Sequence, residues 1–372
     1  MVTFRSLGRT FIPERRYRRR AVKPLARLLL RWFTSHRSRG IENFPRTGPF
    51  IAAGNHRGIM EVFLMVALCP RPMEVLGAGD IPLDPRYRFL ADLYGYIPYR
   101  RGEMDRKALS TAARALKDGR VVGIFPEGGI WKAGEKSAHR GVAWLSVTTG
   151  APVVPIGFAG VYRAVGRAIR LEKPRLETTV GRPIPPPPRP RGTTRRDHIT
   201  AHAHKILEEI TALIPEWDRQ EHRDPPEEEF SLLVRAGARD VTGEILHPEL
   251  LSEFFHTPVL IDVLYTNLKR QGVAPLRRFG RPYPADKLAR AVAILLGYTI
   301  RTNPAFFPYR LGDEKARLLT DALFSLYRLA DALSRAAGSR GETIRIIPIH
   351  RYRTEGSDDW VERREPPQIT RF

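Results

Sequence analysis

The sequence predicts an α/β fold in which a mainly parallel β-sheet is flanked by helices. A basic amphipathic helix precedes this sheet, and a mostly helical extension follows it. Apolar runs of strand length at residues 50–54, 121–125 and 153–156 alternate with segments of helical periodicity. No tight hairpin signal joins these runs, and strands separated by helices usually pair in parallel. Because ligands bind beyond the carboxyl ends of such strands, the residues that follow them are the first candidates for a functional site.

Composition limits the possible classes of protein. The 372 residues are 42% hydrophobic, enough for one large domain or two, and the net charge of +22 indicates anionic partners. The single cysteine, Cys69, excludes an intrachain disulfide framework and favours a reducing cytoplasm. No apolar run is long enough to span a bilayer. No metal-ligand cluster is present in the sequence, and His202 and His204 are predicted to lie on a solvated helix face.

The N-terminal region is strongly basic. Residues 1–40 carry twelve Lys and Arg against Glu14 alone, which is half of the net charge. Residues 21–35 are predicted to form a helix on which Lys23, Arg27 and Arg31 recur at four-residue spacing, with Leu, Trp and Phe side chains on the other side. Two interpretations fit this pattern. The helix lies in a membrane interface, or it packs on its own domain and leaves a basic face in solvent, and both can hold together.

The elements of the central region follow in order. A turn-rich segment leads to the strand at residues 50–53, and a capped helix begins after Asp105. Further strands are expected at residues 73–76, 121–125, 153–156 and 176–180, with a short extended segment at 94–102. Further helices are expected at 62–68, 141–148 and 197–214.

The domain organisation follows from changes in composition. We predict a basic membrane-interface segment over residues 1–39, a catalytic-type α/β domain over 40–218 and a linker over 219–229, where an acidic, proline-containing run lies. A mostly helical accessory region is expected over 230–355, with a strand at 343–352, and a tail over 356–372.

The first chemical candidate is the pair His56 and Glu61. These residues follow the strand at 50–54 and are separated by five positions, so a helix that begins here would bring them to one face. A carboxylate in that position can orient an imidazole and stabilise its charged form while it takes a proton. A histidine and a glutamate alone are weak evidence for catalysis.

Four sequence blocks in order make the interpretation specific. Asn55-His56 with Glu61 is the first block; Gly95, Ile97 and Arg100 form the second; Phe125-Pro126-Glu127-Gly128 is the third; Val154-Pro155-Ile156 is the fourth. With these blocks, residues 40–183 resemble the glycerolipid acyltransferase family, which acylates glycerol 3-phosphate and lysophosphatidic acid.

The resemblance implies an acyltransferase that moves a fatty acyl group from acyl-CoA or acyl carrier protein to a hydroxyl of a lysophospholipid or related acceptor. His56 is then the general base and Glu61 its orienting partner. Substrate-binding roles fall to Asn55, Gly95, Arg100, Arg101, Glu127 and Gly128. The resemblance requires no metal and no cofactor beyond the thioester co-substrate. It places the protein on the cytoplasmic face of the membrane, as a peripheral or monotopic protein on an anionic surface.

Two positions depart from the family pattern. The family usually has Asp where this chain has Glu61, and the resemblance implies that Glu61→Asp keeps or gains activity. Where the third block commonly continues Thr-Arg-Ser, this chain has Gly129-Ile130-Trp131. Either Lys132, Lys136 or Arg140 replaces the missing phosphate ligand, or the acceptor is not lysophosphatidate. The alternative function is a non-catalytic lipid- or membrane-binding protein with this fold. A nucleic-acid-binding function is disfavoured, because no zinc-finger, aromatic RNA-binding or basic-zipper signature is present.

Overall fold

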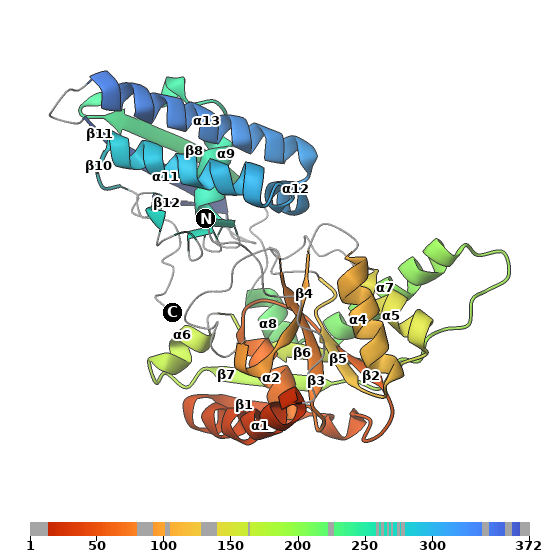
Figure 1. Ribbon diagram of the computed structural model, residues 1–372. Coiled ribbons are helices and arrows are strands. Elements are labelled where there is room, and N and C mark those ends of the chain that lie inside the picture. Colours follow the sequence, from red (N-terminus) through yellow and green to blue (C-terminus); the bar gives the residue numbers. More distant parts are fainter. Residues whose placement is uncertain are drawn as a thin grey trace.

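The computed structural model describes residues 14–79, 92–100, 105–127, 140–162, 164–221, 227–257, 280–336, 342–353 and 359–364, with a few positions between 260 and 276. The chain forms two lobes, each built on its own β-sheet (Figure 1). The first lobe holds the elements up to residue 221, and the second holds those from residue 227 onward.

The first lobe contains a seven-stranded sheet with the order β1-β7-β6-β2-β5-β3-β4. All neighbouring strands run parallel except β6 and β7, which are antiparallel. The mainly parallel sheet expected from the sequence is therefore confirmed. Its strands are β1 (Ser35–Arg39), β2 (Phe50–Gly54), β3 (Met73–Ala78), β4 (Tyr96–Tyr99), β5 (Val121–Ile124), β6 (Val153–Ala159) and β7 (Arg175–Val180).

Helices cover both faces of this sheet (Figure 1). Because side chains alternate along a strand, Ile51 and Ala53 of β2 pack with α4 (Arg106–Lys117), α5 (Gly141–Thr149) and α7 (Arg195–Ala212). Phe50 and Ala52 pack on the other face with α1 (Glu14–Phe33) and α2 (Met60–Leu68). Two short helices, α6 (Ala164–Ile169) and α8 (Glu216–Glu221), follow β6 and α7. The central strand β2 is thus buried on both sides, which explains its uninterrupted apolar sequence.

Strand β1 lies upstream of residue 40, where we expected the α/β domain to begin. It pairs with β7 from Ser35 to Arg39, so the sheet takes in the end of the predicted N-terminal segment. Four of its five residues are exposed, as in an edge strand, and the sequence SHRSR carries no apolar alternation. The strand therefore had no hydrophobic signal in the sequence.

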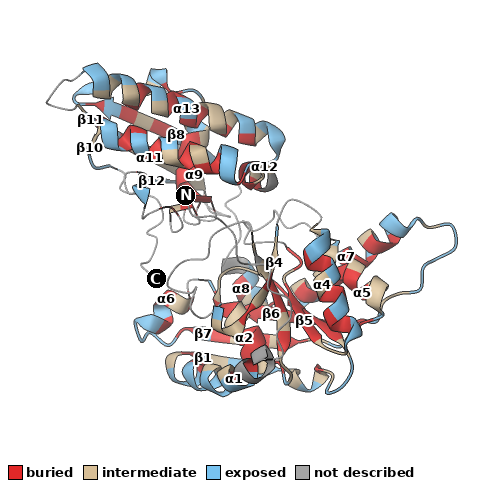
Figure 2. Ribbon diagram, viewed as in Figure 1, coloured by how far each residue is buried: buried red, intermediate tan, exposed pale blue. Residues whose placement is uncertain are grey.

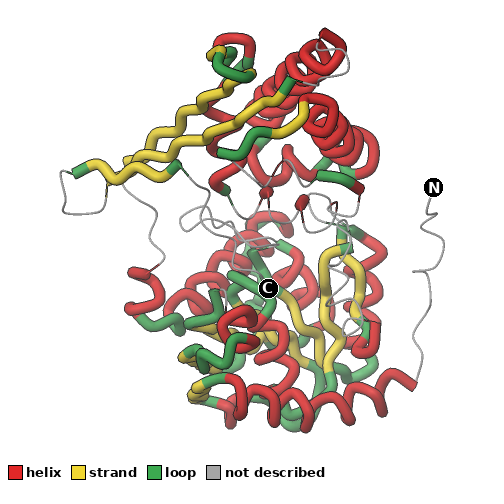
Figure 3. The backbone as a smooth tube through the Cα atoms, turned by 90° about the vertical axis from the view of Figure 1, so that its left-hand side faces the viewer, coloured by secondary structure: helices red, strands yellow, loops and turns green. Residues whose placement is uncertain are grey.

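The second lobe combines the expected helices with an antiparallel sheet. Its strands are β8 (Glu227–Ala236), β9 (Arg239–Asp240), β10 (Tyr283–Pro284), β11 (Thr343–Arg353) and β12 (Trp360–Arg363), and its helices are α9 (Pro248–His256), α11 (Ala285–Gly297), α12 (Phe306–Leu311) and α13 (Asp313–Ala336). The helices lie on one face of the sheet (Figure 3). Leu232, Val234 and Ile346 on that face join a core with α9, α11 and α13.

Strand β8 corrects the expectation of a linker at residues 219–229. The last three residues of the acidic run that suggested a linker, residues 227–229, are the start of this ten-residue strand, and residues 224–226 lie outside the described part of the chain. Glu228 lies 3.1 Å from His350, and Glu229 lies 3.5 Å from Arg351, both on the adjacent strand β11. Glu228 and Glu229, which suggested a solvated linker, therefore form ion pairs across two strands of a sheet.

His202 was also predicted wrongly. It lies on α7 but only 2% of its surface is exposed, and its Nε2 is 3.3 Å from the Ser146 hydroxyl on α5. His204 is exposed, as expected. In the described part of the chain, no helix combines the length and apolar content that a membrane crossing requires.

Candidate active site

The loop between β2 and α2 presents His56 at the carboxyl end of the central strand. Strand β2 ends at Gly54, and α2 begins at Met60. A Cβ atom on Gly54 would lie 2.5 Å from the Phe158 ring, so only glycine allows the loop to leave the sheet against β6. The packing of β2 against β6 therefore fixes where the loop begins.

Asn55 anchors this loop rather than facing a substrate. Its side chain is fully buried: its Nδ2 donates to the Phe158 carbonyl at 2.9 Å, and its Oδ1 accepts from the Phe158 N–H at 2.7 Å. Both ends of the amide are thus used by one residue of β6. The expectation that Asn55 binds substrate is not met by this geometry, because the side chain has no exposed surface to offer. These two hydrogen bonds hold the start of the loop that carries His56.

His56 and Glu61 are in direct contact. The His56 Nδ1 lies 3.0 Å from Glu61 Oε1, and Glu61 is fully buried while 21% of the His56 side chain is exposed. A carboxylate oxygen only accepts hydrogen bonds, so an ionised Glu61 fixes the neutral tautomer with the proton on Nδ1. Nε2 is then left with a lone pair.

The same carboxylate also holds the loop in place. Oε1 of Glu61 accepts hydrogen bonds from the backbone N–H groups of Arg57 and Gly58, the latter at 2.7 Å. Three donors therefore converge on one buried oxygen. These three contacts satisfy the Oε1 atom of the buried side chain. The result is a rigid connection between the imidazole, the loop and the first turn of α2.

The Phe125-Pro126-Glu127 segment completes the surroundings of His56. The Phe125 ring stacks on the imidazole with ring centroids 4.3 Å apart and planes 19° apart. Glu127 is almost fully buried, and its Oε2 accepts from the His56 backbone N–H at 3.3 Å. Glu127 thus supports the loop of the candidate base. No role was predicted for Phe125, although it directly follows the buried strand β5 and precedes the Pro126-Glu127 pair.

The backbone N–H groups next to the imidazole are already in use. Those of His56, Arg57 and Gly58 donate to Glu127 or Glu61. An oxyanion formed at this site therefore has to find its hydrogen-bond donors elsewhere.

The second block lies apart from His56. Strand β4 is three positions from β2 in the sheet, which corresponds to about 14 Å at the usual spacing between strands. Arg100 is exposed at the carboxyl end of β4, on the same edge of the sheet as His56, and its N–H donates to Asp105 at 3.0 Å. Gly95 precedes β4 at the opposite end, with φ of 71°, and its carbonyl accepts from Arg19 at 3.1 Å. Gly95 is therefore a turn residue away from the candidate base.

Other predicted residues lie outside the described part of the chain, namely Arg101, Gly128, Lys132 and Lys136. Arg140 is described and is exposed directly before α5. Among the described residues, no group of three or more His, Cys, Asp and Glu side chains is arranged to hold a metal ion.

Comparisons with known proteins identify similar acyltransferases. Residues 35–159 match the family model Acyltransferase. A 1-acyl-sn-glycerol-3-phosphate acyltransferase of Borreliella burgdorferi is 26% identical over 121 residues, which is 32% of this chain and 48% of that protein. A protein of the same name from Bacillus subtilis is 24% identical over 145 residues, covering 38% and 70% of the two chains.

A solved structure was also found. It is the 1-acyl-sn-glycerophosphate acyltransferase of Thermotoga maritima, with a TM-score of 0.41 and 20% identity over 56% of this chain and 84% of that chain. The chain spans about half the length of the Borreliella relative.

Proposed function

Residues 35–159 form a domain of the glycerolipid acyltransferase family, and from this premise we propose that the protein is an O-acyltransferase. It would transfer a fatty acyl group from the thioester of acyl-CoA or acyl carrier protein to a hydroxyl of a lysophospholipid or related lipid. One observation carries the proposal. The His56 imidazole is bonded through Nδ1 to a buried carboxylate, and its other nitrogen belongs to a partly exposed side chain.

The proposed reaction uses that second nitrogen as a general base. His56 Nε2 takes the proton of the acceptor hydroxyl as the oxygen attacks the thioester carbonyl and a C–O bond forms. The tetrahedral intermediate then breaks its C–S bond. The leaving thiolate takes the proton back from His56, so the products are an ester and a free thiol, and the enzyme returns to its starting state.

Glu61 would act on the charge that His56 gains. When the imidazole is protonated, its positive charge lies against a buried carboxylate at 3.0 Å. The Phe125 ring would limit rotation of the imidazole by stacking on it. Neither residue needs to touch the substrate to support this step.

The acceptor class is proposed from the relatives, whose names specify 1-acyl-sn-glycerol 3-phosphate. A lipid acceptor also suggests a peripheral position on the cytoplasmic face of a membrane, where thioester donors are made. Arg100 remains a candidate for the acceptor phosphate, since it lies on the same edge of the sheet as His56.

The test is a purified-protein assay with an acyl-CoA and lysophosphatidate, followed by thiol release and by mass spectrometry of the lipid product. Wild type should form phosphatidate, and His56→Ala should lose at least about a hundredfold in rate, as expected for removal of a general base. His56→Ala should remain folded, with a thermal midpoint moderately below that of wild type because Glu61 Oε1 loses one of its three donors. A variant that kept the wild-type rate would refute the mechanism. A wild-type protein that bound lipid without turnover on any acceptor or donor would favour the non-catalytic alternative.

A further inference from the structure

If helix α1 had a solvated basic face, its apolar side would pack on the protein. The structure shows a different orientation. Three basic residues of α1, Arg19, Lys23 and Arg27, bind the body of the first lobe. Arg19 donates to the carbonyls of Tyr94 and Gly95 at 3.0 and 3.1 Å, and it pairs with Glu74. The Arg19 guanidinium is therefore bound to the first lobe and does not extend into the solvent.

Two further basic residues of α1 cap the end of α2. Lys23 donates to the Cys69 carbonyl, and Arg27 Nε donates to the Ala67 carbonyl at 2.8 Å. The last carbonyls of a helix lack partners within the helix and carry partial negative charge, so cations are favourable there. These contacts fix the rotation of α1 about its own axis.

The fixed rotation turns the apolar side of α1 outward. Leu25, Leu28, Leu29 and Trp32 are 54%, 52%, 47% and 68% exposed. Their spacing of three and four positions places them on one stripe of the helix. Figure 2 shows exposed residues along the outer side of α1, at the margin of the first lobe. Helix α1 does pack on its own domain, through Leu30 and Phe33, but four residues of its predicted apolar side face outward, so the expected orientation is corrected. We call these four residues the apolar stripe.

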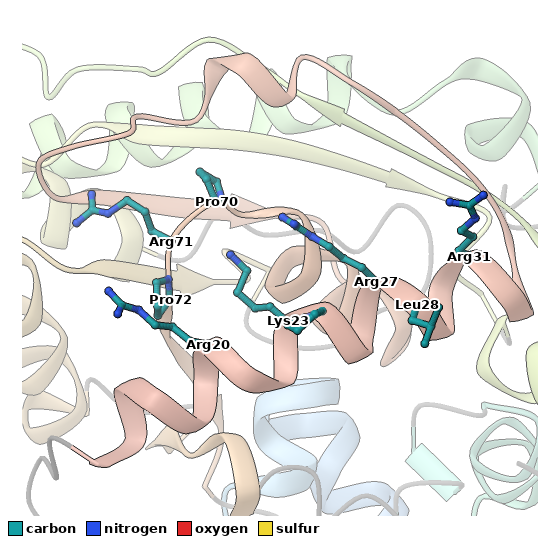
Figure 4. A pocket seen from close by; sticks show the side chains of 9 residues that line it. Arg20, Lys23, Arg27, Leu28, Arg31, Pro70, Arg71 and Pro72 are labelled. Carbon is teal, nitrogen blue, oxygen red and sulfur yellow. The ribbon is translucent and has the colours of Figure 1, made fainter.

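A cationic groove lies beside the stripe. It has a volume of about 660 Å³ and is formed by α1 and the Pro70–Pro72 turn that follows α2 (Figure 4). Five cationic side chains and no acidic one line it: Arg20, Lys23, Arg27, Arg31 and Arg71. Arg20 and Arg31 are exposed, and within the described residues neither forms an ion pair. Figure 4 shows their guanidinium groups at opposite ends of the groove.

From this arrangement we propose that the groove binds the phosphate of an anionic phospholipid headgroup while the apolar stripe enters the same leaflet. Cations gathered without counter-charge attract an anion, and phosphate suits the planar guanidinium group. An exposed apolar stripe next to them favours a lipid as the source of that phosphate. Leu28 lines the groove and also belongs to the stripe, so one surface provides both interactions.

The surface does not depend on catalysis. A protein without acyltransferase activity would still carry it, and a His56→Ala variant should bind vesicles as wild type does. Failure of membrane binding and failure of the proposed reaction can therefore be told apart.

The experiment measures partitioning of the full chain onto vesicles of phosphatidylcholine, with and without phosphatidylglycerol. Wild type should bind the anionic vesicles, and binding should weaken as salt increases. The double substitution Arg20→Gln and Arg31→Gln should lower partitioning about 25-fold, since each juxtamembrane cation contributes about fivefold. The matched control is Arg189→Gln with Arg191→Gln, which removes the same charge from an exposed loop of the first lobe. This control should change partitioning by less than about threefold.

The stripe is tested separately. Trp32 fluorescence should shift to shorter wavelength on anionic vesicles, and Trp32→Phe should abolish that shift. Leu29→Gln with Trp32→Gln should weaken binding to anionic vesicles without changing its relative dependence on salt. Equal losses in the groove pair and in the loop control would overturn the proposal, because binding would then follow net charge alone. Binding of inorganic phosphate without binding of anionic vesicles would also overturn it, by indicating a site for a free anion.

Discussion

Replacing Glu61 by Gln tests the proposed dyad by removing a charge with little change in shape. The glutamine side chain has the same length, and its oxygen can still accept from His56 Nδ1 and from the Arg57 and Gly58 N–H groups. What disappears is the negative charge 3.0 Å from the imidazole. The variant therefore isolates the electrostatic part of the contact.

The magnitude follows from the geometry. Opposite charges about 4 Å apart interact by about 4 kcal/mol at an effective dielectric constant of about 20. That energy corresponds to roughly a thousandfold in rate. Because 21% of the His56 side chain is exposed to water, and because glutamine still accepts a hydrogen bond, we expect a smaller loss in kcat/KM, of about a hundredfold or somewhat more.

The assay is acyl transfer to lysophosphatidate over a range of pH, with denaturant unfolding as the control for structure. Glu61→Gln should unfold near the wild-type midpoint while its kcat/KM falls. An activity within threefold of wild type would refute the argument that the Glu61 charge supports catalysis.

Glu61→Asp is the informative partner of this variant. It keeps the charge but shortens the side chain by one methylene, about 1.5 Å, so a contact of 3.0 Å would open beyond hydrogen-bond range unless the loop followed. The resemblance to the family implied that aspartate would keep or raise activity. The structure leads us to expect the reverse: a loss of activity together with about 1–3 kcal/mol less stability, because the Arg57 and Gly58 N–H groups lose their acceptor. Full activity in Glu61→Asp would show that the loop adapts and that reach is not limiting.

Two further predictions concern stability. Asn55→Ala should lower the free energy of unfolding by about 2–4 kcal/mol, because the Phe158 N–H and carbonyl both lose a buried partner; urea unfolding checks this, and an unchanged midpoint would contradict the clamp. Burial lowers the pKa of His202 from 6.5 to about 4, with the nearby charges of His198 and Lys205 adding to the effect. The unfolded chain therefore takes up a proton before the folded one does, and stability should fall by up to about 1.4 kcal/mol per pH unit between pH 6.5 and 4. His202→Gln should make this dependence shallower, and an equal slope in variant and wild type would rule out the contribution.

The sequence predicted the parts of the fold whose signals are local. The central strands are buried on both faces, and their sequences are therefore continuous apolar runs. The contact between His56 and Glu61 spans five positions, so the first turn of one helix can make it. The structure added Phe125, which reaches His56 only because β5 lies beside β2.

Other features depend on residues far apart in the chain. The side-chain amide of Asn55 forms hydrogen bonds with the backbone of Phe158, 103 positions later. No pattern of residue spacing in the sequence predicts that contact. Helical periodicity showed that α1 has two faces but did not show which one turns inward. That choice follows from the free carbonyls at the end of α2, at Ala67 and Cys69. Strand β8 was missed because its charged partners lie on β11, more than a hundred residues later.

The length of α2 has a consequence for how many lipids the protein would engage at once. His56 precedes the first turn of this nine-residue helix, and the cationic groove lies at its last turn, so the two are separated by about 13 Å along its axis. In a lysophospholipid, the free hydroxyl is only a few covalent bonds from the phosphate, on the order of 5 Å. A lipid whose phosphate occupied the groove would therefore hold its hydroxyl out of reach of His56. The lipid that anchors the protein and the lipid that is acylated must be different molecules, and the composition of the surrounding leaflet could control residence on the membrane without competing for the acceptor position.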